Sequence, residues 1–370
     1  MPIKIITIND LDSSQRRIVN MRPFDSSMYV SGPPGSGKTS VAILRTKMIL
    51  DNGFSNVMFL LYNHSLYGYL NKIFSKMKIT NSINIQTKDQ FFYRLAMNMG
   101  CHNNNYEPYE VKYAGWLRAI MSASDSSLPS CQLLIMDESQ DFSDAELAIL
   151  KRMSKKMLAL ADFDQQLYGK HGTPAAFGSL PHIELETIYR FGKEIAEIAQ
   201  PFSASATNLI TKVTKTGFTP AYRVHTNPSN EISVISQIIK NKMVADGTMA
   251  ILSPAKASLE KLSRMLRSEG INHFYSTNNK DLREYDFDSK CPLLITANSA
   301  KGLEFDTVIL YKYTRSSMYV ENKKEILYMS LTRTCSELYV LEDSETCDEL
   351  RNLRGLREMS DSRNNDINDF

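Results

Sequence analysis

A glycine-rich segment near the N-terminus constrains the fold of this chain more than any other feature. It follows a short apolar run, opens a helical pattern, and reads Gly32-Pro33-Pro34-Gly35-Ser36-Gly37-Lys38-Thr39. Backbone amides at a helix N-terminus can wrap phosphate oxygens, because glycine lets the backbone approach them closely. In such a segment Lys38 neutralises phosphate charge and the Thr39 hydroxyl ligates Mg²⁺. The segment therefore predicts a nucleotide-binding loop, which extends to Ser40.

A second candidate site lies where another apolar run ends. The run Leu133–Met136 is followed by Asp137-Glu138-Ser139-Gln140-Asp141. A buried strand here would deliver Asp137 to Mg²⁺ beside the phosphates and leave Glu138 to orient or deprotonate the attacking water. The alternative is an exposed acidic loop after a core strand. Together the two sites predict nucleotide binding and hydrolysis, which kinases, small GTPases, transport ATPases and helicases share.

Short apolar runs alternate with amphipathic stretches along most of the chain. This pattern is typical of strands that cross over through helices into a mostly parallel sheet, and it occurs twice. We expect strands at 28–31, 57–61, 83–87, 133–136 and 157–161, and again at 249–252, 293–296, 308–311 and 338–341. The predicted fold class is α/β, with two mostly parallel sheets flanked by helices.

Breaks in this periodicity divide the chain into three parts. Glycines and prolines over residues 172–181 interrupt the pattern, which predicts a first domain over residues 1–180 and a second over residues 181–345. The composition then turns polar, so residues 346–370 are expected to form a C-terminal tail.

Composition and charge exclude several classes of protein. No segment approaches the roughly 18 uncharged apolar residues of a membrane span, so we expect a cytoplasmic protein with no membrane partner. The five cysteines are scattered and form no Cys-x-x-Cys pair, which indicates neither a zinc site nor a disulfide framework. A net charge of +2 neither supports nor excludes nucleic acid, because a nearly neutral total can hide a basic groove.

Several further segments resemble, in order, the motifs of the UvrD/Rep/PcrA-like group of superfamily 1 helicases, from Leu11 to about Val340. The acidic run at 137–141 is similar to the second motif of that family, and Gln15 is similar to its adenine-reading glutamine. A side-chain amide can both donate to and accept from an adenine edge. The resemblance implies two RecA-like domains, with ATP and Mg²⁺ as cofactors.

The later motifs of this family sense the phosphates. In the segment similar to the third motif, the resemblance implies that Gln165 senses the γ-phosphate and Tyr168 stacks on a base. In the fourth, Tyr189 is implied to pack on adenine and Arg190 to reach the γ-phosphate. In the sixth, Arg333 matches an arginine finger, which stabilises charge on the γ-phosphoryl group only when the cleft closes.

The fifth motif is the most distinctive segment after the phosphate loop. From Thr296 the chain reads Thr-Ala-Asn-Ser-Ala-Lys-Gly-Leu-Glu-Phe, close to the Thr-x-His-x-Ala-Lys-Gly-Leu-Glu-Phe of the family. The resemblance implies that this segment couples nucleotide to nucleic acid, with Gly302 and Glu304 on the nucleotide and Thr296 on the strand.

The family contacts nucleic acid through segments that face away from the nucleotide. Here these segments resemble Tyr62-Asn63 and the run that begins at Thr87. Aromatic faces stack on bases without reading sequence, while amide and hydroxyl groups contact the backbone. The alternative for each residue is an ordinary place in the core or on the surface.

Several positions depart from the family pattern. Lys170 stands where a second stacking aromatic is expected, Asn298 replaces a histidine, and Lys88-Asp89 replaces an aromatic-histidine pair. The large inserted subdomains that normally engage duplex are also missing. We therefore expect ATP hydrolysis and movement along a single strand more than strand separation.

Two functions of different classes follow. The first is an ATP-dependent helicase or translocase on single-stranded DNA, moving 3′ to 5′ as the resemblance implies, with RNA left open as the strand. The second is a nucleotide-gated regulatory subunit that controls a protein partner such as a nuclease, in DNA repair or antiphage defence. The missing insertions favour the second function. A small-molecule kinase is disfavoured, because it does not explain Lys301-Gly302-Leu303-Glu304.

Overall fold

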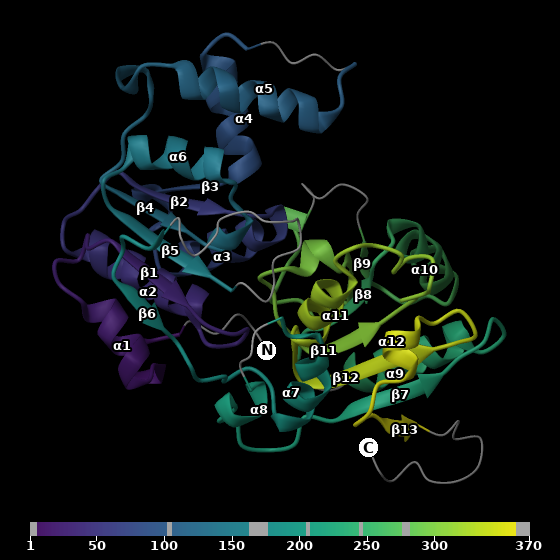
Figure 1. Cartoon of the computed structure of the whole chain (residues 1–370). Coiled ribbons are helices and arrows are strands. Elements are labelled where there is room, and N and C mark those ends of the chain that lie inside the picture. Colours follow the sequence, from purple (N-terminus) through teal and green to yellow (C-terminus); the bar gives the residue numbers. More distant parts are fainter. Residues whose placement is uncertain are drawn as a thin grey trace. The chain divides into compact units, whose positions relative to one another are not determined.

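The computed structural model describes residues 6–101, 106–162, 177–204, 208–243, 247–275 and 282–359. The chain divides into two compact units, one formed by residues 3–188 with 279–285 and the other by the rest. Each unit is built on one β-sheet flanked by helices (Figure 1). Within the described ranges, no helix is both long and apolar enough to cross a membrane.

The first unit contains a six-stranded sheet in the order β3-β2-β4-β5-β1-β6, and every described pairing is parallel. Its strands are β1 (Met28–Ser31), β2 (Val57–Leu61), β3 (Ile83–Thr87), β4 (Leu133–Met136), β5 (Met157–Ala161) and β6 (His182–Glu184). Its helices are α1 (Ser13–Asn20), α2 (Lys38–Asp51), α3 (His64–Lys76), α4 (Lys88–Asn98), α5 (Tyr109–Ser122) and α6 (Asp144–Met153), with short 3-10 turns that include η4 (Ser139–Asp141).

Two apolar layers cover the sheet of the first unit. Val30 and Phe59 pack with α1, α2 and α3, whereas Leu60 and Met136 pack on the opposite face with α4, α5 and α6 (Figure 1). This division follows from strand geometry, in which successive side chains point to opposite faces. Because β2, β4 and β5 are buried along their whole length, the strand ends that carry the candidate nucleotide segments are firmly fixed.

The second unit contains a seven-stranded sheet in the order β13-β7-β12-β11-β8-β10-β9, again parallel at each described pairing. Its strands are β7 (Ala221–His225), β8 (Met249–Ser253), β9 (Phe274–Tyr275), β10 (Leu293–Thr296), β11 (Phe305–Leu310), β12 (Thr334–Glu342) and β13 (Arg357–Met359). Its helices are α7 (Lys193–Ala199), α8 (Leu209–Lys212), α9 (Glu231–Met243), α10 (Lys256–Ser268), α11 (Lys323–Leu331) and α12 (Asp348–Arg351).

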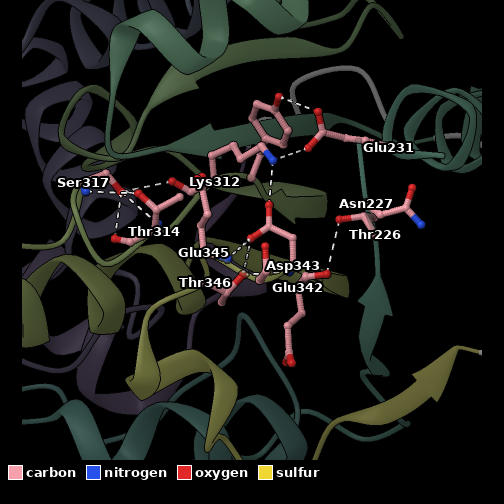
Figure 2. A network of polar contacts seen from close by, with 12 residues as sticks. Thr226, Asn227, Glu231, Lys312, Thr314, Ser317, Glu342, Asp343, Glu345 and Thr346 are labelled. Atoms are coloured by element: carbon pink, nitrogen blue, oxygen red, sulfur yellow. Dashed lines mark hydrogen bonds and ion pairs between the residues drawn. The ribbon is translucent and has the colours of Figure 1, made fainter. Parts of the chain in front are cut away.

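A polar network fixes the carboxyl ends of β11 and β12 in the second unit (Figure 2). The Lys312 ammonium pairs with Glu231 at 2.5 Å and with Asp343 at 2.6 Å. The Tyr311 hydroxyl also donates to Glu231, at 3.2 Å. Because both carboxylates are largely buried, each requires this cation. The network therefore ties the start of α9 to the ends of two strands.

The structure confirms the predicted fold class, and each strand predicted from the sequence is present. The two compact units differ from the predicted domain limits at three places, one of which is the grouping of residues 279–285 with the first unit. Strand β6 lies beyond residue 180 yet pairs with β1, so the first unit extends past that point. Residues 346–359, expected to belong to the tail, form α12 and β13, and β13 pairs with β7. Strands β6 and β13 lie at sheet edges, where backbone pairing does not require apolar side chains. The rest of the predicted tail, residues 360–370, lies outside the described part of the chain.

Candidate functional site

The phosphate loop runs from the end of β1 to the start of α2. Gly37 is the N-cap of α2 and has a φ of 85°, a conformation that residues with side chains rarely adopt. At Gly32 a Cβ atom would lie 2.6 Å from the Leu185 carbonyl oxygen and 2.7 Å from the Ser36 hydroxyl. These glycines are therefore required by the backbone path, which places the loop amides at a helix N-terminus.

Lys38 lies across this loop. Its ammonium donates to the carbonyl oxygens of Gly32 at 2.6 Å and Pro33 at 3.0 Å, and it lies 3.8 Å from the Asp162 carboxylate. Charge-assisted bonds to phosphate are stronger than bonds to neutral carbonyls. A triphosphate in the loop would thus draw the ammonium from these two carbonyl oxygens.

Thr39 and Asp137 bring two oxygen atoms together from α2 and the end of β4. The Thr39 hydroxyl donates to Asp137 Oδ2 at 2.8 Å. Burial, and then the neighbouring Glu138 carboxylate, raise the pKa of Asp137 above its usual range. In the described part of the chain, no group of three His, Cys, Asp or Glu side chains could hold a metal ion. The pair formed by Thr39 and Asp137 fits Mg²⁺, which proteins bind through one or two side chains together with substrate phosphates and water.

Glu138 is presented by a tight turn after β4. Its backbone is left-handed, with a φ of 55° and a ψ of 43°, and this conformation costs about 1–2 kcal/mol for a residue with a side chain. The Gln140 amide donates to Glu138 Oε2 at 2.5 Å and accepts from the Asp162 amide at 3.1 Å. Gln140 is fully buried, so it holds the carboxylate in one place. Gln140 had no role predicted from the sequence, although it lies inside the acidic run.

Gln15 lies against the phosphate loop. It is 4% exposed, and its amide nitrogen donates to the Ser36 carbonyl at 2.9 Å. Its amide oxygen accepts from the Asp12 backbone at 3.0 Å, within the cap of α1. The side chain therefore supports the loop directly. A contact with adenine would have to use the remaining N–H and lone pair of the amide.

In the second unit, Arg190 joins residues from the predicted fourth, fifth and sixth motifs. Its guanidinium pairs with Glu304 at 2.9 Å and donates to the Thr332 carbonyl at 3.1 Å. The Lys215 ammonium in turn donates to the Arg190 carbonyl at 3.0 Å. Tyr189, which directly precedes Arg190 in the chain, is 42% exposed. The second unit thus gathers three predicted motifs in one place.

Arg333 is held inside the second unit. It is 1% exposed, and its guanidinium donates to the carbonyl oxygens of Met329 at 3.1 Å and Leu303 at 3.0 Å. Gly302, with a φ of 81°, turns the chain immediately before Leu303. The predicted arginine finger therefore binds backbone carbonyls of its own unit in this structure.

Two of the residues predicted to bind nucleic acid make local hydrogen bonds. The Asn63 side chain accepts from the Leu66 amide at 2.9 Å and caps α3. The Thr296 hydroxyl donates to the Ser299 hydroxyl at 2.9 Å, just beyond the end of β10. Their polar groups are therefore already engaged within the protein.

The other two described residues of that set, Tyr62 and Thr87, both adjoin Lys88. Tyr62 is half-buried, and the Lys88 ammonium lies 5.6 Å from the centroid of its ring. Thr87 is 1% exposed, and its buried hydroxyl has no hydrogen-bond partner among the described residues. Both residues lie at the carboxyl ends of neighbouring strands, Tyr62 directly after β2 and Thr87 as the last residue of β3.

Family comparisons decide among the classes of nucleotide hydrolase that share these groups. A family described as an AAA domain matches residues 15–171. A second family, described as the viral superfamily 1 RNA helicase core domain, matches residues 104–342, more than half of the chain. The chain belongs to the superfamily 1 helicases. It is therefore an enzyme that hydrolyses a nucleoside triphosphate, and enzymes of this family use Mg²⁺ and bind nucleic acid.

Solved structures resemble this chain at low sequence identity. The C-terminal domain of a possible DNA helicase from Lactobacillus plantarum WCFS1 is 19% identical with a TM-score of 0.37, and the match covers 46% of this chain and 98% of that one. The helicase of PRRSV is 16% identical with a TM-score of 0.44, over 93% of this chain and 55% of that one. Arterivirus nonstructural protein 10, a helicase in complex with DNA, is 14% identical with a TM-score of 0.43, over 92% and 64%.

This chain thus spans about half to two thirds of the length of the two viral helicases that it resembles. No curated protein matches its sequence. The predicted residues Gln165 and Tyr168, together with Lys170, lie outside the described residues. Of the described ones, the groups predicted to bind phosphate and Mg²⁺ lie in the first unit, and both predicted arginines lie in the second.

Proposed function

We propose that this helicase is an ATP-dependent motor of the UvrD/Rep/PcrA-like type that moves 3′ to 5′ along single-stranded DNA. The observation that carries the proposal is the bonded set in the first unit, in which Thr39 contacts Asp137 and Gln140 holds Glu138. A fixed hydroxyl, an aspartate and a second carboxylate next to a phosphate loop are the parts that triphosphate hydrolysis requires.

In the proposed mechanism, the loop from Gly32 to Thr39 and the Lys38 ammonium bind the phosphates. Thr39 and Asp137 would hold Mg²⁺, which would supply positive charge to the triphosphate. Glu138 orients the attacking water and accepts its proton, while Gln140 keeps the carboxylate in position. Gln15 supports the loop from behind and contributes to adenine recognition.

The arginines of the second unit supply the link to movement. Arg333 donates to two backbone carbonyls, and Arg190 pairs with Glu304. We propose that closure of the two RecA-like domains around ATP moves both guanidinium groups onto the γ-phosphate. Because this exchange occurs only when the domains close, hydrolysis is tied to domain movement.

The strand is proposed to be DNA on the strength of the motif resemblance. RNA is the second candidate, because the matching family is described as an RNA helicase core. The test is steady-state ATP hydrolysis by the full chain without nucleic acid and with single-stranded DNA, duplex DNA or single-stranded RNA. We expect single-stranded DNA to raise turnover about tenfold or more, within the ordinary range of coupling between two sites. A turnover that no nucleic acid changes would overturn the motor.

A nucleotide-gated regulatory subunit for a partner such as a nuclease is the second candidate function. It is favoured by Asn63 and Thr296, whose polar groups are engaged in local hydrogen bonds. The test is to purify the chain with its stable partners and compare partner activity with and without the Lys38→Ala substitution. Partner activity that follows the substitution supports this function, and partner activity that ignores it argues against it.

A further inference from the structure

Lys88 occupies an unusual position between the two predicted functional regions of the first unit. It is the first residue of α4 and directly follows Thr87. Its ammonium donates to the Asp141 carbonyl at 3.0 Å and pairs with Glu146 at 3.2 Å. The same ammonium lies 5.6 Å from the centroid of the Tyr62 ring.

On the hydrolytic side, Lys88 contacts the turn that presents Glu138. Asp141 is the last residue of η4, which also contains Gln140. Gln140 donates to Glu138 and directly precedes Asp141, so the Lys88 contact adjoins the residue that holds the carboxylate proposed to orient water. A displacement of the Lys88 ammonium would therefore act on the backbone of this turn.

Lys88 lies over two aromatic rings, the buried ring of Phe142 at 5.5 Å and, on the nucleic-acid side, the half-buried ring of Tyr62. A cation over a tyrosine ring is attracted by the electron density of that face, and this attraction is worth about 0.5–1 kcal/mol at exposed sites and more when water is excluded. A nucleobase stacked on Tyr62 would change both the hydration and the position of the ring. The ammonium is the group that would respond directly.

The ion pair with Glu146 keeps Lys88 from swinging into solvent. Glu146 is 1% exposed and also accepts from the Ser143 amide at 2.6 Å and from the Tyr113 hydroxyl. A carboxylate this deeply buried requires its cation, because an unpaired buried charge costs several kcal/mol. Lys88 can therefore shift locally but cannot leave.

We propose that Lys88 is a positioning residue that transmits nucleic-acid binding at Tyr62 and Thr87 to the turn that carries Gln140 and Glu138. The proposal rests on the proposed function, because it requires a strand that binds near Tyr62. It assigns a role to the lysine that replaces an aromatic residue of the family pattern. The competing account is that Lys88 is only the counter-ion of Glu146.

Three variants separate these accounts. Lys88→Met removes the cation but leaves Glu146 buried without a partner, so it is expected to lower stability. Lys88→Met combined with Glu146→Gln removes both charges and is expected to recover most of that loss, because neutral replacement of a buried pair is often tolerated. Lys88→Arg keeps the cation. Lys47→Met, which removes an exposed ion pair with Asp51, is the matched control.

The measurements are thermal unfolding, the affinity for a fluorescent oligothymidylate with and without a non-hydrolysable ATP analogue, and ATP turnover with and without the oligonucleotide. Two ratios are compared: oligonucleotide affinity with and without the ATP analogue, and ATP turnover with and without the oligonucleotide. We expect the double variant to fold like the parent and to lose about tenfold in both ratios. Lys88→Arg should keep both ratios within about threefold, and Lys47→Met should leave them unchanged.

Recovery of both ratios in the double variant would overturn the proposal and leave Lys88 as a counter-ion. Loss of both ratios in Lys88→Arg, with normal unfolding, would also count against it, because the cation would still be present. If both ratios are close to one in the parent protein, the proposed function itself would be refuted. The two failures are therefore distinguishable.

Discussion

The phosphate-binding groups of the first unit and the arginines of the second unit are held in different ways. In the first unit the groups contact one another, as when Thr39 donates to Asp137 at 2.8 Å. In the second unit the arginines are bound to other parts of their own unit, and Arg333 donates to two backbone carbonyls. On the proposed function, the first set needs only a short movement of Lys38 away from two loop carbonyls. The arginines must leave their partners in the second unit to reach the γ-phosphate.

This difference shows which step is open to control. A guanidinium bonded to phosphate joins two opposite charges, whereas a guanidinium bonded to a backbone carbonyl joins a charge to a neutral dipole, so the bond to phosphate is the stronger one. The exchange by Arg333 is therefore favourable once a γ-phosphate comes within reach, and unfavourable without one. On the proposed function, the first unit would bind ATP in any state, while the second unit would decide when hydrolysis occurs.

The largest predicted effect comes from breaking the assembled set at Lys38. Lys38→Ala removes the cation that lies across the phosphate loop, so we expect loss of both tight ATP binding and turnover. Steady-state ATP hydrolysis and binding of a fluorescent ATP analogue measure the two effects. Lys47→Ala, an exposed position on the same helix, is the control; hydrolysis that survives Lys38→Ala would contradict the assignment of the site.

Breaking the second set should separate binding from hydrolysis. Arg333→Ala is expected to slow hydrolysis by about 10³-fold, the usual effect of a lost arginine finger, and to leave ATP affinity within about threefold because ground-state binding needs no finger. Single-turnover hydrolysis at saturating ATP is the measurement. Because Arg333 is buried, thermal unfolding of the variant is its control, and equal losses of affinity and rate in a folded variant would count against the role.

Gln140 sharpens the comparison within the first unit. Gln140→Ala leaves Glu138 without the amide that holds it, and misplacing a catalytic group by about 1 Å can cost about 10²-fold in rate. We expect a loss of about that size in turnover, with ATP affinity retained. A change in affinity without a change in rate would place Gln140 in nucleotide binding instead.

Substitution of Gln15 has the smallest predicted effect. It tests whether this one side chain both supports the phosphate loop and contacts the adenine base. Gln15→Ala removes a buried hydrogen bond to the Ser36 carbonyl, so affinity should fall for any nucleotide. We expect a loss of about tenfold for ATP and about threefold for GTP, consistent with one or two buried hydrogen bonds. Competition binding with both nucleotides measures this; equal losses would leave Gln15 as a support of the loop alone.

The sequence predicted the central strands well because these strands are buried on both faces. Runs such as Val57–Leu61 and Leu133–Met136 contain only apolar residues, and turns bound them on each side. The edge strands β6 and β13 gave no comparable signal, unlike β3, which also lies at a sheet edge. In β6 and β13 the side chains are mostly polar and exposed, and backbone pairing alone defines the strand.

Contacts between distant segments could not be read from spacing. Arg45 is an example, because a basic residue on a helix is usually solvent-exposed. Here it is fully buried and donates to five carbonyl oxygens between Ile18 and Phe24, and burial lowers its pKa to about 10. These bonds tie α1, and with it Gln15, to the helix that follows the phosphate loop. Gln140 was missed for the same reason, because one of its partners, Asp162, lies 22 positions further along the chain.

The most direct test of the motor is displacement of streptavidin from single-stranded DNA biotinylated at one end. A protein that moves 3′ to 5′ pushes streptavidin from the 5′ end, so we expect faster release there than from the 3′ end. This release should require ATP and disappear in Lys38→Ala. ATP hydrolysis stimulated by DNA without faster release from either end would contradict movement along the strand.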